Sequence, residues 1–380
     1  MDKYPLNRER LAETFVHLCE IESPSRRERR VADYLTGLFT ELGAESIIED
    51  DSAEKTGSDC GNLIVRFPGT VDKAPLFFAC HMDTVEPGCG VQVLRTGDLF
   101  SSRGNTILGG DDKSGIAATI ELIRLLHEHD MEHGPIEILL TTCEEVGLLG
   151  AKHLDHSLVT AKQGYALDST GIDRVIIGAP AANRLSVEVR GIAAHAGLNP
   201  EQGVSALCLA ARAIADLRLG RLDEQSTANF GLIHGGVATN IVPDRITLEG
   251  EVRSHSPEKL EAYTQEIEAT FRNVIRNWSD QTGASGQPSV EISVAMEYPA
   301  LRLEDWDTVV TRVHRAGDLL GREISFQVAG GGSDANIFNS YGLETAIVAT
   351  GMDKVHTTDE CLNLNDLERL TELLLAIVQV

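Results

Sequence analysis

The segment Leu76-Phe-Phe-Ala-Cys-His-Met-Asp-Thr-Val85 decides how this chain is expected to fold. It opens with a continuous apolar run, Leu76–Cys80, and passes directly into His81 and Asp83. A short run that is apolar at every position is typical of a strand covered on both faces, as in a parallel sheet. In open α/β sheets ligands bind beyond the carboxyl ends of the strands, so polar residues that follow such a run are candidates for a functional site.

The same pattern recurs along the chain, because other short apolar runs also lead into acidic residues or into a loop that carries a histidine. Strands that alternate with helices in this way are typical of an α/β fold. We therefore expect a mostly parallel central sheet flanked by helices. Its further strands are expected at Asn62–Phe67, Ile136–Thr141, Tyr165–Leu167 and Thr345–Ala349, and two of its helices at Ser114–His129 and Asn365–Val380.

The N-terminal part is expected to form two helices. Ser25 and Glu28 have the spacing of a capping box, which predicts that the second helix begins there. Apolar residues then recur at helical spacing as far as Gly43, which is expected to end the helix.

The middle of the chain has a different pattern, whose strands and helices follow the order β-α-β-β-α-β of a ferredoxin-like sandwich. We expect an inserted α+β dimerisation domain at residues 182–293, within a catalytic domain made of residues 1–181 and 294–380. The strands of the insertion are expected at Leu185–Val189, Phe230–Ile233, Ile246–Val252 and Val290–Ala295, and its helices at Ser205–Leu217 and from Pro257 to about Trp278.

Composition limits the partners and the compartment. The 380 residues include 33 Lys+Arg and 58 Asp+Glu, which gives a formal net charge of −25. Such a charge repels nucleic acid and anionic lipid, so we expect neither as a partner. No apolar run approaches the ~20 residues of a membrane helix, and the first residues lack the apolar core of a signal peptide. We expect a cytoplasmic protein whose seven cysteines are reduced, because no CxxC pair is present.

Two histidines and six carboxylates follow the ends of the expected strands or open the helix after them. Carboxylates crowded together raise one another's pKa unless cations compensate them, and Lys113 is the only positive charge in the local sequence. One or two divalent metal ions would supply that charge. Histidine together with Asp and Glu suits zinc and tolerates manganese or cobalt. The residues are His81, Asp83, Asp111, Asp112, Glu144, Glu145, Asp168 and His356.

Other motifs are absent or are explained without a ligand. The sequence contains no HExxH, GxSxG or GxGxxG motif, which excludes zincin chemistry. His127, His129 and His133 lie at the end of an expected helix, where histidines interact favourably with the helix dipole. We therefore do not interpret them as metal ligands.

Nearly the whole chain resembles the di-zinc exopeptidase family that includes peptidase T, carboxypeptidase G and succinyl-diaminopimelate desuccinylase, and most closely its bacterial peptidase T-like members. The motifs that carry the resemblance in the expected catalytic domain are His81-Met-Asp83-Thr-Val, Gly109-Gly-Asp111-Asp-Lys-Ser-Gly115, Thr142-Cys-Glu144-Glu145-Val-Gly147, Ala166-Leu-Asp168 and Val355-His356-Thr-Thr. Those in the insertion are Ala194-His195-Ala-Gly197, Gly235-Gly-Val-Ala-Thr-Asn240-Ile-Val-Pro243 and Glu251-Val-Arg253.

The resemblance implies a zinc exopeptidase-like fold and a role for each motif of the catalytic domain. Asp111 would bridge two metal ions, with His81 and Asp168 completing one site and Glu145 and His356 the other. Asp83 would accept a hydrogen bond from the far nitrogen of His81 and fix its tautomer. Glu144 would be the general base, which takes a proton from a water activated by the two metals and returns it to the leaving amine.

The resemblance also implies roles for residues of the insertion and of a glycine-rich loop. His195 would reach the active site of the partner subunit of a homodimer and help to hold the oxyanion. Asn240 and Arg253 would bind the carboxylate or carbonyl groups of the substrate, together with the backbone of Gly331 and Gly332. The residues alone leave open that His195 is a structural loop histidine and that Asn240 and Arg253 are ordinary surface residues. Peptidase T has an arginine where this chain has Gly330, so its tripeptide specificity is not implied by this loop.

We therefore expect a metal-dependent exopeptidase of short peptides, an aminopeptidase resembling peptidase T, which uses two divalent ions, zinc in the first place. The alternative is an N-acyl amino acid amidohydrolase of deacylase or desuccinylase type on the same scaffold, because the two activities share every catalytic residue. A non-catalytic metal-binding protein is disfavoured, since all the implied ligands and the base are present.

Overall fold

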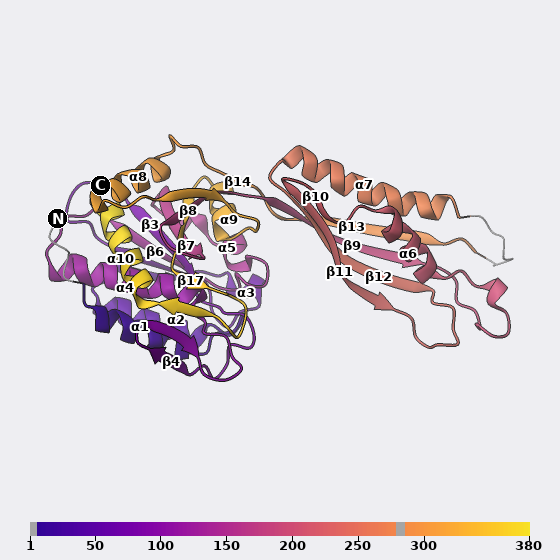
Figure 1. Cartoon of the computed structure of the whole chain (residues 1–380), viewed down its shortest axis with the longest axis horizontal. Helices are drawn as coiled ribbons and strands as arrows, with labels where there is room; N and C mark the ends of the chain where they lie inside the picture. The colour runs from indigo at the N-terminus through magenta and orange to yellow at the C-terminus, as the bar shows by residue number, and fades with distance from the viewer. Residues whose placement is uncertain (1–5, 279–285) are drawn as a thin grey trace. The chain divides into compact units, whose positions relative to one another are not determined.

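A computed structural model of the chain describes residues 6–278 and 286–380, and it divides into two compact units (Figure 1). The first unit runs to Gly178 and includes Leu301–Ala329 and Ser333–Val380. The second consists of Ala179–Ala300 together with Gly330–Gly332. The second unit thus contains the expected insertion and extends a few residues beyond 182 and 293, and the placing of the domain boundaries at those two residues stays a prediction.

The first unit is built on a nine-stranded sheet in which four central strands are parallel. They lie in the order β6 (Ile136–Thr141), β3 (Leu76–His81), β7 (Gln163–Ser169) and β16 (Glu344–Ala349). Every position of β3 and β6 is buried, which confirms the α/β fold expected from their apolar sequences. The outer strands are β1 (Ser46–Glu49), β2 (Leu63–Phe67), β8 (Arg174–Ala179), β14 (Leu301–Arg302) and β15 (Ser325–Val328).

Helices surround this sheet in the first unit (Figure 1). The central one is α4 (Gly110–Glu128), which is buried along most of its length and packs against β3, β7 and two further helices, α1 and α10. Aromatic pairs such as Phe78 with Tyr165, whose ring centroids lie 6.1 Å apart, fill the core. The other helices are α1 (Arg8–Glu20), α2 (Arg29–Glu41), α3 (Ala53–Thr56), α5 (Leu149–His153), α8 (Thr308–Leu320), α9 (Asp334–Ser340) and α10 (Leu364–Gln379), with a 3-10 turn at His156–Leu158.

A small four-stranded sheet in the first unit is not apparent from the sequence. Its order is β17-β18-β5-β4, and neighbouring strands are antiparallel. Strand β17 has only two residues and β4 is mostly exposed, so neither gives an apolar run in the sequence. The sheet matters because the loop between β17 and β18 carries His356. Its strands are β4 (Val93–Thr96), β5 (Leu99–Ser102), β17 (Met352–Asp353) and β18 (Cys361–Asn363).

The predicted capping box at Ser25 and Glu28 is wrong. Helix α2 begins at Arg29, and Glu28 makes no side-chain cap hydrogen bond to it. The hydroxyl of Ser25 instead donates to Asp83, and the carboxylate of Glu28 accepts the backbone N–H of Cys143. Although they have cap spacing, these two residues therefore bind the loops that follow β3 and β6. The helix does end close to Gly43, whose φ is 82°.

The second unit is an antiparallel five-stranded sheet in the order β10-β11-β12-β9-β13. Without the edge strand β10, this is the strand order of a ferredoxin-like sandwich, as expected. Two helices, α6 and α7, lie along one side of the sheet in Figure 1, where residues such as Leu209 and Phe271 join the core formed by alternate residues of β9. The elements are β9 (Ala181–Arg190), α6 (Ala206–Asp216), β10 (Gly220–Asp223), β11 (Ser226–Gly235), β12 (Arg245–Ser254), α7 (Pro257–Arg276) and β13 (Ser289–Tyr298), with a 3-10 turn at Pro200–Gln202.

Within the described part of the chain, every helix is too short or too polar to span a lipid bilayer.

Candidate metal centre

Six of the residues predicted from the sequence lie at one edge of the central sheet of the first unit. Because β3, β6, β7 and β16 are parallel, their carboxyl ends meet at this edge. His81 ends β3, and Glu144 and Glu145 follow β6. Asp168 belongs to β7, Asp111 lies in the first turn of α4, and His356 lies between β17 and β18.

Two groups of these side chains have the composition of a metal site, and they share Asp111. In the first group, ligand atoms of His81, Asp111 and Asp168 all lie within 4.8 Å of one another. In the second group the same holds for Asp111, Glu145 and His356. The two oxygens of Asp111 face different histidines, since Oδ1 lies 3.1 Å from His81 Nε2 and Oδ2 lies 3.2 Å from His356 Nε2.

The distances within these groups fit a bound divalent ion. Two atoms that each lie about 2.0–2.1 Å from a tetrahedral zinc ion are about 3.3 Å apart. His356 Nε2 lies 3.0 Å from Glu145 Oε1, and the two contacts of Asp111 are of similar length. Imidazole nitrogens with carboxylate oxygens are a donor set that suits zinc and is compatible with manganese. These side chains therefore fit the divalent metal ions that the sequence predicts.

The charges of the cluster also fit a bound cation. Burial, followed by the neighbouring carboxylate of Asp168, raises the pKa of Glu144, and burial and Asp111 do the same for Asp168. Hydrogen bonds to Asp111 and Glu145 raise the pKa of His356 to about 10. These raised pKa values show that the cluster binds protons more tightly than isolated side chains do, because it holds more negative charge than nearby side chains neutralise. A divalent ion supplies the same compensation and competes with those protons.

Lys113 does not neutralise the cluster directly, although it is the one local positive charge in the sequence. Its side chain is buried, and its ammonium group donates to the hydroxyl of Ser23 and to the carbonyl of Met82. Burial lowers the pKa of Lys113 to about 8. Its contacts therefore hold the backbone between His81 and Asp83.

The carboxylate of Asp83 holds the turn that carries the two glutamates. Its Oδ1 accepts the backbone N–H of Glu144 at 2.9 Å, and its Oδ2 accepts that of Glu145 at 3.3 Å and the hydroxyl of Ser25 at 2.6 Å. The nearest partner of His81 Nδ1 is the backbone carbonyl of Asp83 at 2.9 Å, whereas the carboxylate is 3.5 Å away. The carbonyl is thus better placed than the predicted carboxylate to select the tautomer of His81.

Glu28 supports the same turn from its other side. Cys143 precedes the two glutamates and has a φ of 54°, which strains a residue with a side chain. The Oε1 of Glu28 accepts the backbone N–H of Cys143 at 3.0 Å, and its Oε2 accepts the hydroxyl of Ser58 at 2.6 Å. Glu28 also lies close to Asp59 and Cys60 in a group that could hold a metal ion. Its carboxylate oxygens are already occupied by donors, so we do not assign an ion there.

Sequence reasoning missed two buried acids beside the cluster, Asp334 and Glu360. Asp334 opens α9, and burial raises its pKa to about 6. Its Oδ2 accepts the hydroxyl of Thr141 at 2.5 Å, whereas Oδ1 has no partner among the described residues. Glu360 accepts the backbone N–H groups of Leu108 and Gly109, directly before α4, and of Asp111, in its first turn. The glycine-rich motif before Ser333 marks the position of Asp334, but nothing in the local sequence marks Glu360.

Of the three histidines that were not interpreted as metal ligands, His127 and His133 make contacts of another kind. The ring of His127 packs edge-on against Phe67, with centroids 6.1 Å apart, and His133 Nδ1 lies 2.8 Å from the carbonyl of Gly134. None of the three belongs to a metal-capable group among residues 6–278 and 286–380.

Two predicted residues of the second unit, His195 and Asn240, lie next to each other. His195 forms a β-bridge with Ile241, and the carbonyl of Asn240 accepts the backbone N–H of Ala196 at 2.9 Å. The ring of His195 is exposed, and its Nδ1 accepts the backbone N–H groups of Gly197 and Leu198, each at 3.2 Å. An Nδ1 that accepts hydrogen bonds leaves the proton on Nε2. His195 therefore presents an N–H donor at the outer edge of its ring.

Arg253 and the glycine loop lie together, also in the second unit. A Cβ added at Gly331 would lie 3.6 Å from the guanidinium of Arg253. At Gly332 it would lie 2.4 Å from the ring of Tyr298, whose hydroxyl accepts the backbone N–H of Gly332 at 3.3 Å. Packing on Tyr298, which sequence reasoning missed, therefore requires a glycine at 332. The Nε of Arg253 is buried without a partner among the described residues, and its Nη2 pairs with Glu251 at 2.9 Å.

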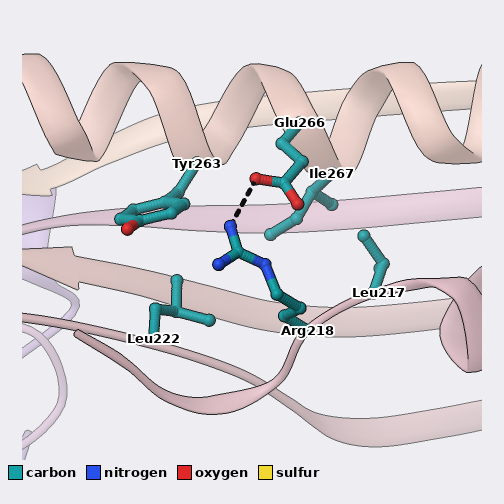
Figure 2. Close-up of a pocket in the computed structure, with 6 residues that line it drawn as sticks. All are labelled: Leu217, Arg218, Leu222, Tyr263, Glu266 and Ile267. Carbon is teal, nitrogen blue, oxygen red and sulfur yellow. Dashed lines mark hydrogen bonds and ion pairs between the residues drawn. The ribbon is translucent and has the colours of Figure 1, made fainter.

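A separate pocket in the second unit has none of this chemistry (Figure 2). Arg218 extends into it, pairs with Glu266 at 3.0 Å and lies over the ring of Tyr263, 5.6 Å from its centroid. The remaining lining is aliphatic and contains neither histidine nor cysteine.

Two family models match the chain, the peptidase dimerisation domain over residues 178–279 and peptidase family M28 over residues 62–198. Uncharacterized protein YqjE of Bacillus subtilis (strain 168) is 40% identical over 375 residues, which cover 98% of this chain and 99% of YqjE. The crystal structure of aminopeptidase PepT from Bacillus cereus ATCC 10987 is 40% identical, with a TM-score of 0.88 and 98% of both chains covered. That of a tripeptidase from Staphylococcus aureus subsp. aureus Mu50 is 35% identical, with a TM-score of 0.91 and again 98% of both chains covered.

Proposed function

This chain belongs to the peptidase T-like zinc exopeptidase family, and we propose that it is a metal-dependent aminopeptidase that releases the N-terminal residue of short peptides. The observation that carries this proposal is the pair of ligand groups that share Asp111, with Glu144 beside them. The similar proteins of Bacillus cereus and Staphylococcus aureus, which are named as an aminopeptidase and a tripeptidase, support the choice of substrate.

We propose that two ions bind, one in each of the two ligand groups that share Asp111. One ion would be held by His81, Asp111 and Asp168, and the other by Asp111, Glu145 and His356. When bound, two divalent ions lower the pKa of a water molecule and polarise the carbonyl of the bond to be cleaved. Zinc is the ion that this donor set favours, and manganese or cobalt are the alternatives.

Glu144 acts as general base and then as general acid. It belongs to neither of the two groups that share Asp111, yet an oxygen of its carboxylate lies within 4.8 Å of ligand atoms of His81 and Glu145. Asp83 accepts the backbone N–H of Glu144. This hydrogen bond fixes the backbone from which the carboxylate of Glu144 extends. The carboxylate takes a proton from the attacking water and delivers it to the amine that leaves.

Residues of the second unit bind the substrate and its oxyanion. His195 donates from Nε2 to the oxygen that becomes negatively charged, because Nδ1 is occupied by two backbone N–H groups. We propose that this histidine comes from the partner subunit of a homodimer, which the match to a peptidase dimerisation domain supports. Arg253, with Asn240 and the backbone of Gly331 and Gly332, binds carboxylate or carbonyl groups of the peptide.

An N-acyl amino acid amidohydrolase would use the same catalytic residues, so the substrate panel decides between the two activities. Metal-loaded enzyme is assayed against a series of di- and tripeptides with free N-termini and against N-acetyl and N-succinyl amino acids. Turnover of the peptides, lost when their N-termini are blocked, is the expected result. Turnover confined to the N-acyl amino acids would contradict the proposed aminopeptidase.

A further inference from the structure

The side chain of Glu360 is buried and accepts three backbone N–H groups from one short loop. Its Oε2 lies 2.8 Å from the N of Leu108 and 2.8 Å from the N of Gly109, and its Oε1 lies 3.1 Å from the N of Asp111. The side chain is 1% exposed. Charge-assisted hydrogen bonds of this kind are roughly twice as strong as those between neutral groups.

The loop needs such a partner because its backbone is not helical. Gly109 adopts a left-handed conformation with a φ of 75°, and Asp111 has φ and ψ of −83° and 106°. Backbone N–H groups in this conformation lack the partners that a regular helix or strand provides. Glu360 satisfies three of them at once, in the segment from which the carboxylate of Asp111 extends.

Glu360 is also tied to the segment that carries His356. Its own N–H donates to the carbonyl of Thr357 at 3.1 Å, which closes a turn directly after His356. His356 itself has a φ of 61°, so its position depends on how this loop is held. Asp111 and His356 belong to one ligand group, and both are attached to segments that Glu360 joins.

We propose that Glu360 is a positioning residue that sets the spacing of Asp111 and His356, and through Asp111 the geometry of both metal sites. The inference rests on the proposed two-metal function. Glu360 is not itself a ligand, because its oxygens are occupied by backbone donors and it belongs to no metal-capable group among the described residues. Residues that orient metal ligands in this way change metal affinity by about 10–100-fold when they are replaced.

The test replaces Glu360 with glutamine and, in a second variant, with aspartate. Glu360→Gln keeps the size of the side chain but turns an NH₂ group toward backbone N–H groups. Glu360→Asp keeps the charge but withdraws it by about 1.5 Å, the length of one C–C bond. The control is Asp359→Asn, which removes an exposed carboxylate one residue away. Dissociation constants for Zn²⁺ and Mn²⁺ are measured by competition with a chelating dye, after circular dichroism has established which variants are folded.

Each folded Glu360 variant is expected to bind both ions at least tenfold more weakly than the wild type, whereas Asp359→Asn binds them unchanged. At saturating metal the variants regain turnover with an unaltered KM for the peptide, which loss of stability alone would not produce. Wild-type dissociation constants in either folded variant would overturn the inference. Failure of the wild-type protein itself to bind two ions would instead contradict the proposed function.

Discussion

The Nε2 atom of His356 lies 3.2 Å from Oδ2 of Asp111. One residue lies in the loop between two short strands near the C-terminus, and the other lies in the first turn of α4. Their contact completes a ligand group whose other carboxylate follows β6. The fold thus brings together, at one edge of the sheet, residues that lie far apart in the sequence.

Replacing Glu144 with glutamine tests the assignment of the general base. The variant is expected to lose turnover by about 10²–10⁴-fold, because the amide cannot accept a proton from water. Its metal content is expected to equal that of the wild type, since Glu144 lies outside both ligand groups that share Asp111. Glu132→Gln, at an exposed position, is the control. Wild-type turnover in Glu144→Gln would remove this residue from the mechanism.

Mixed dimers test whether His195 acts across a subunit interface. Chains with Glu144→Gln and chains with His195→Ala are each expected to be nearly inactive on their own. When the two are co-expressed with different tags and the mixed dimers are purified through both tags, one of the two sites in each dimer, roughly half of all sites, combines an intact Glu144 with an intact His195 of the other chain. Activity near that fraction of wild type supports action across the interface. Mixed dimers as inactive as the parent variants would contradict it.

Metal affinity is expected to rise with pH. The pKa of His356 in the metal-free protein is raised from 6.5 to about 10 by Asp111 and Glu145, so a proton competes with the metal over that range. The same shift stabilises the metal-free fold below pH 6.5, and that stabilisation is lost as pH rises through about 10. Dissociation constants measured at pH 7, 8 and 9 are expected to fall stepwise. A constant affinity over this range would show that metal binding displaces no proton from His356.

Packing around Gly115 predicts the effect of a single methyl group. A Cβ at this position would lie 2.6 Å from Asp112 Oδ1 and 2.7 Å from the Cβ of Leu167. Gly115→Ala is therefore expected to lower the free energy of unfolding by about 1–3 kcal/mol and to weaken metal binding, because it displaces the start of α4. Gly37 is the matched control, since it lies in α2 with no atom within 4 Å of an added Cβ.

Urea titrations of the two glycine variants measure this difference. Gly37→Ala is expected to be neutral or to stabilise the protein by up to about 1 kcal/mol, since alanine favours a helix more than glycine does. Equal midpoints for Gly115→Ala and the wild type would show that α4 accommodates the methyl group without strain.

Part of the cluster was predictable, because some of its residues end or follow apolar strands and the direction of parallel strands places such residues at one edge. His81 directly ends β3, and Asp168 lies near the end of β7. Ser25 and Glu28 show where local patterns fail, because a pair with cap spacing looks the same whether it binds its own helix or a distant loop. Their partners, Asp83 and Cys143, are defined only once the sheet has formed.

Glu360 could not be identified from the sequence for the same physical reason. It precedes a strand of three residues and contacts a loop near position 110, and no local periodicity encodes that contact. Tyr298 is a similar case, since its role depends on what packs against Gly332.

The most direct test of the account is a count of bound metal in three forms of the protein. Purified chain is loaded with Zn²⁺ or Mn²⁺, freed of excess ion and analysed by elemental mass spectrometry. Because Asp111 is shared by both ligand groups and Asp168 belongs to one, the wild type is expected to hold two ions per chain, Asp168→Asn one, and Asp111→Asn none. A wild type without stoichiometric metal, or an Asp111→Asn variant that still holds two ions, would contradict the two-metal centre.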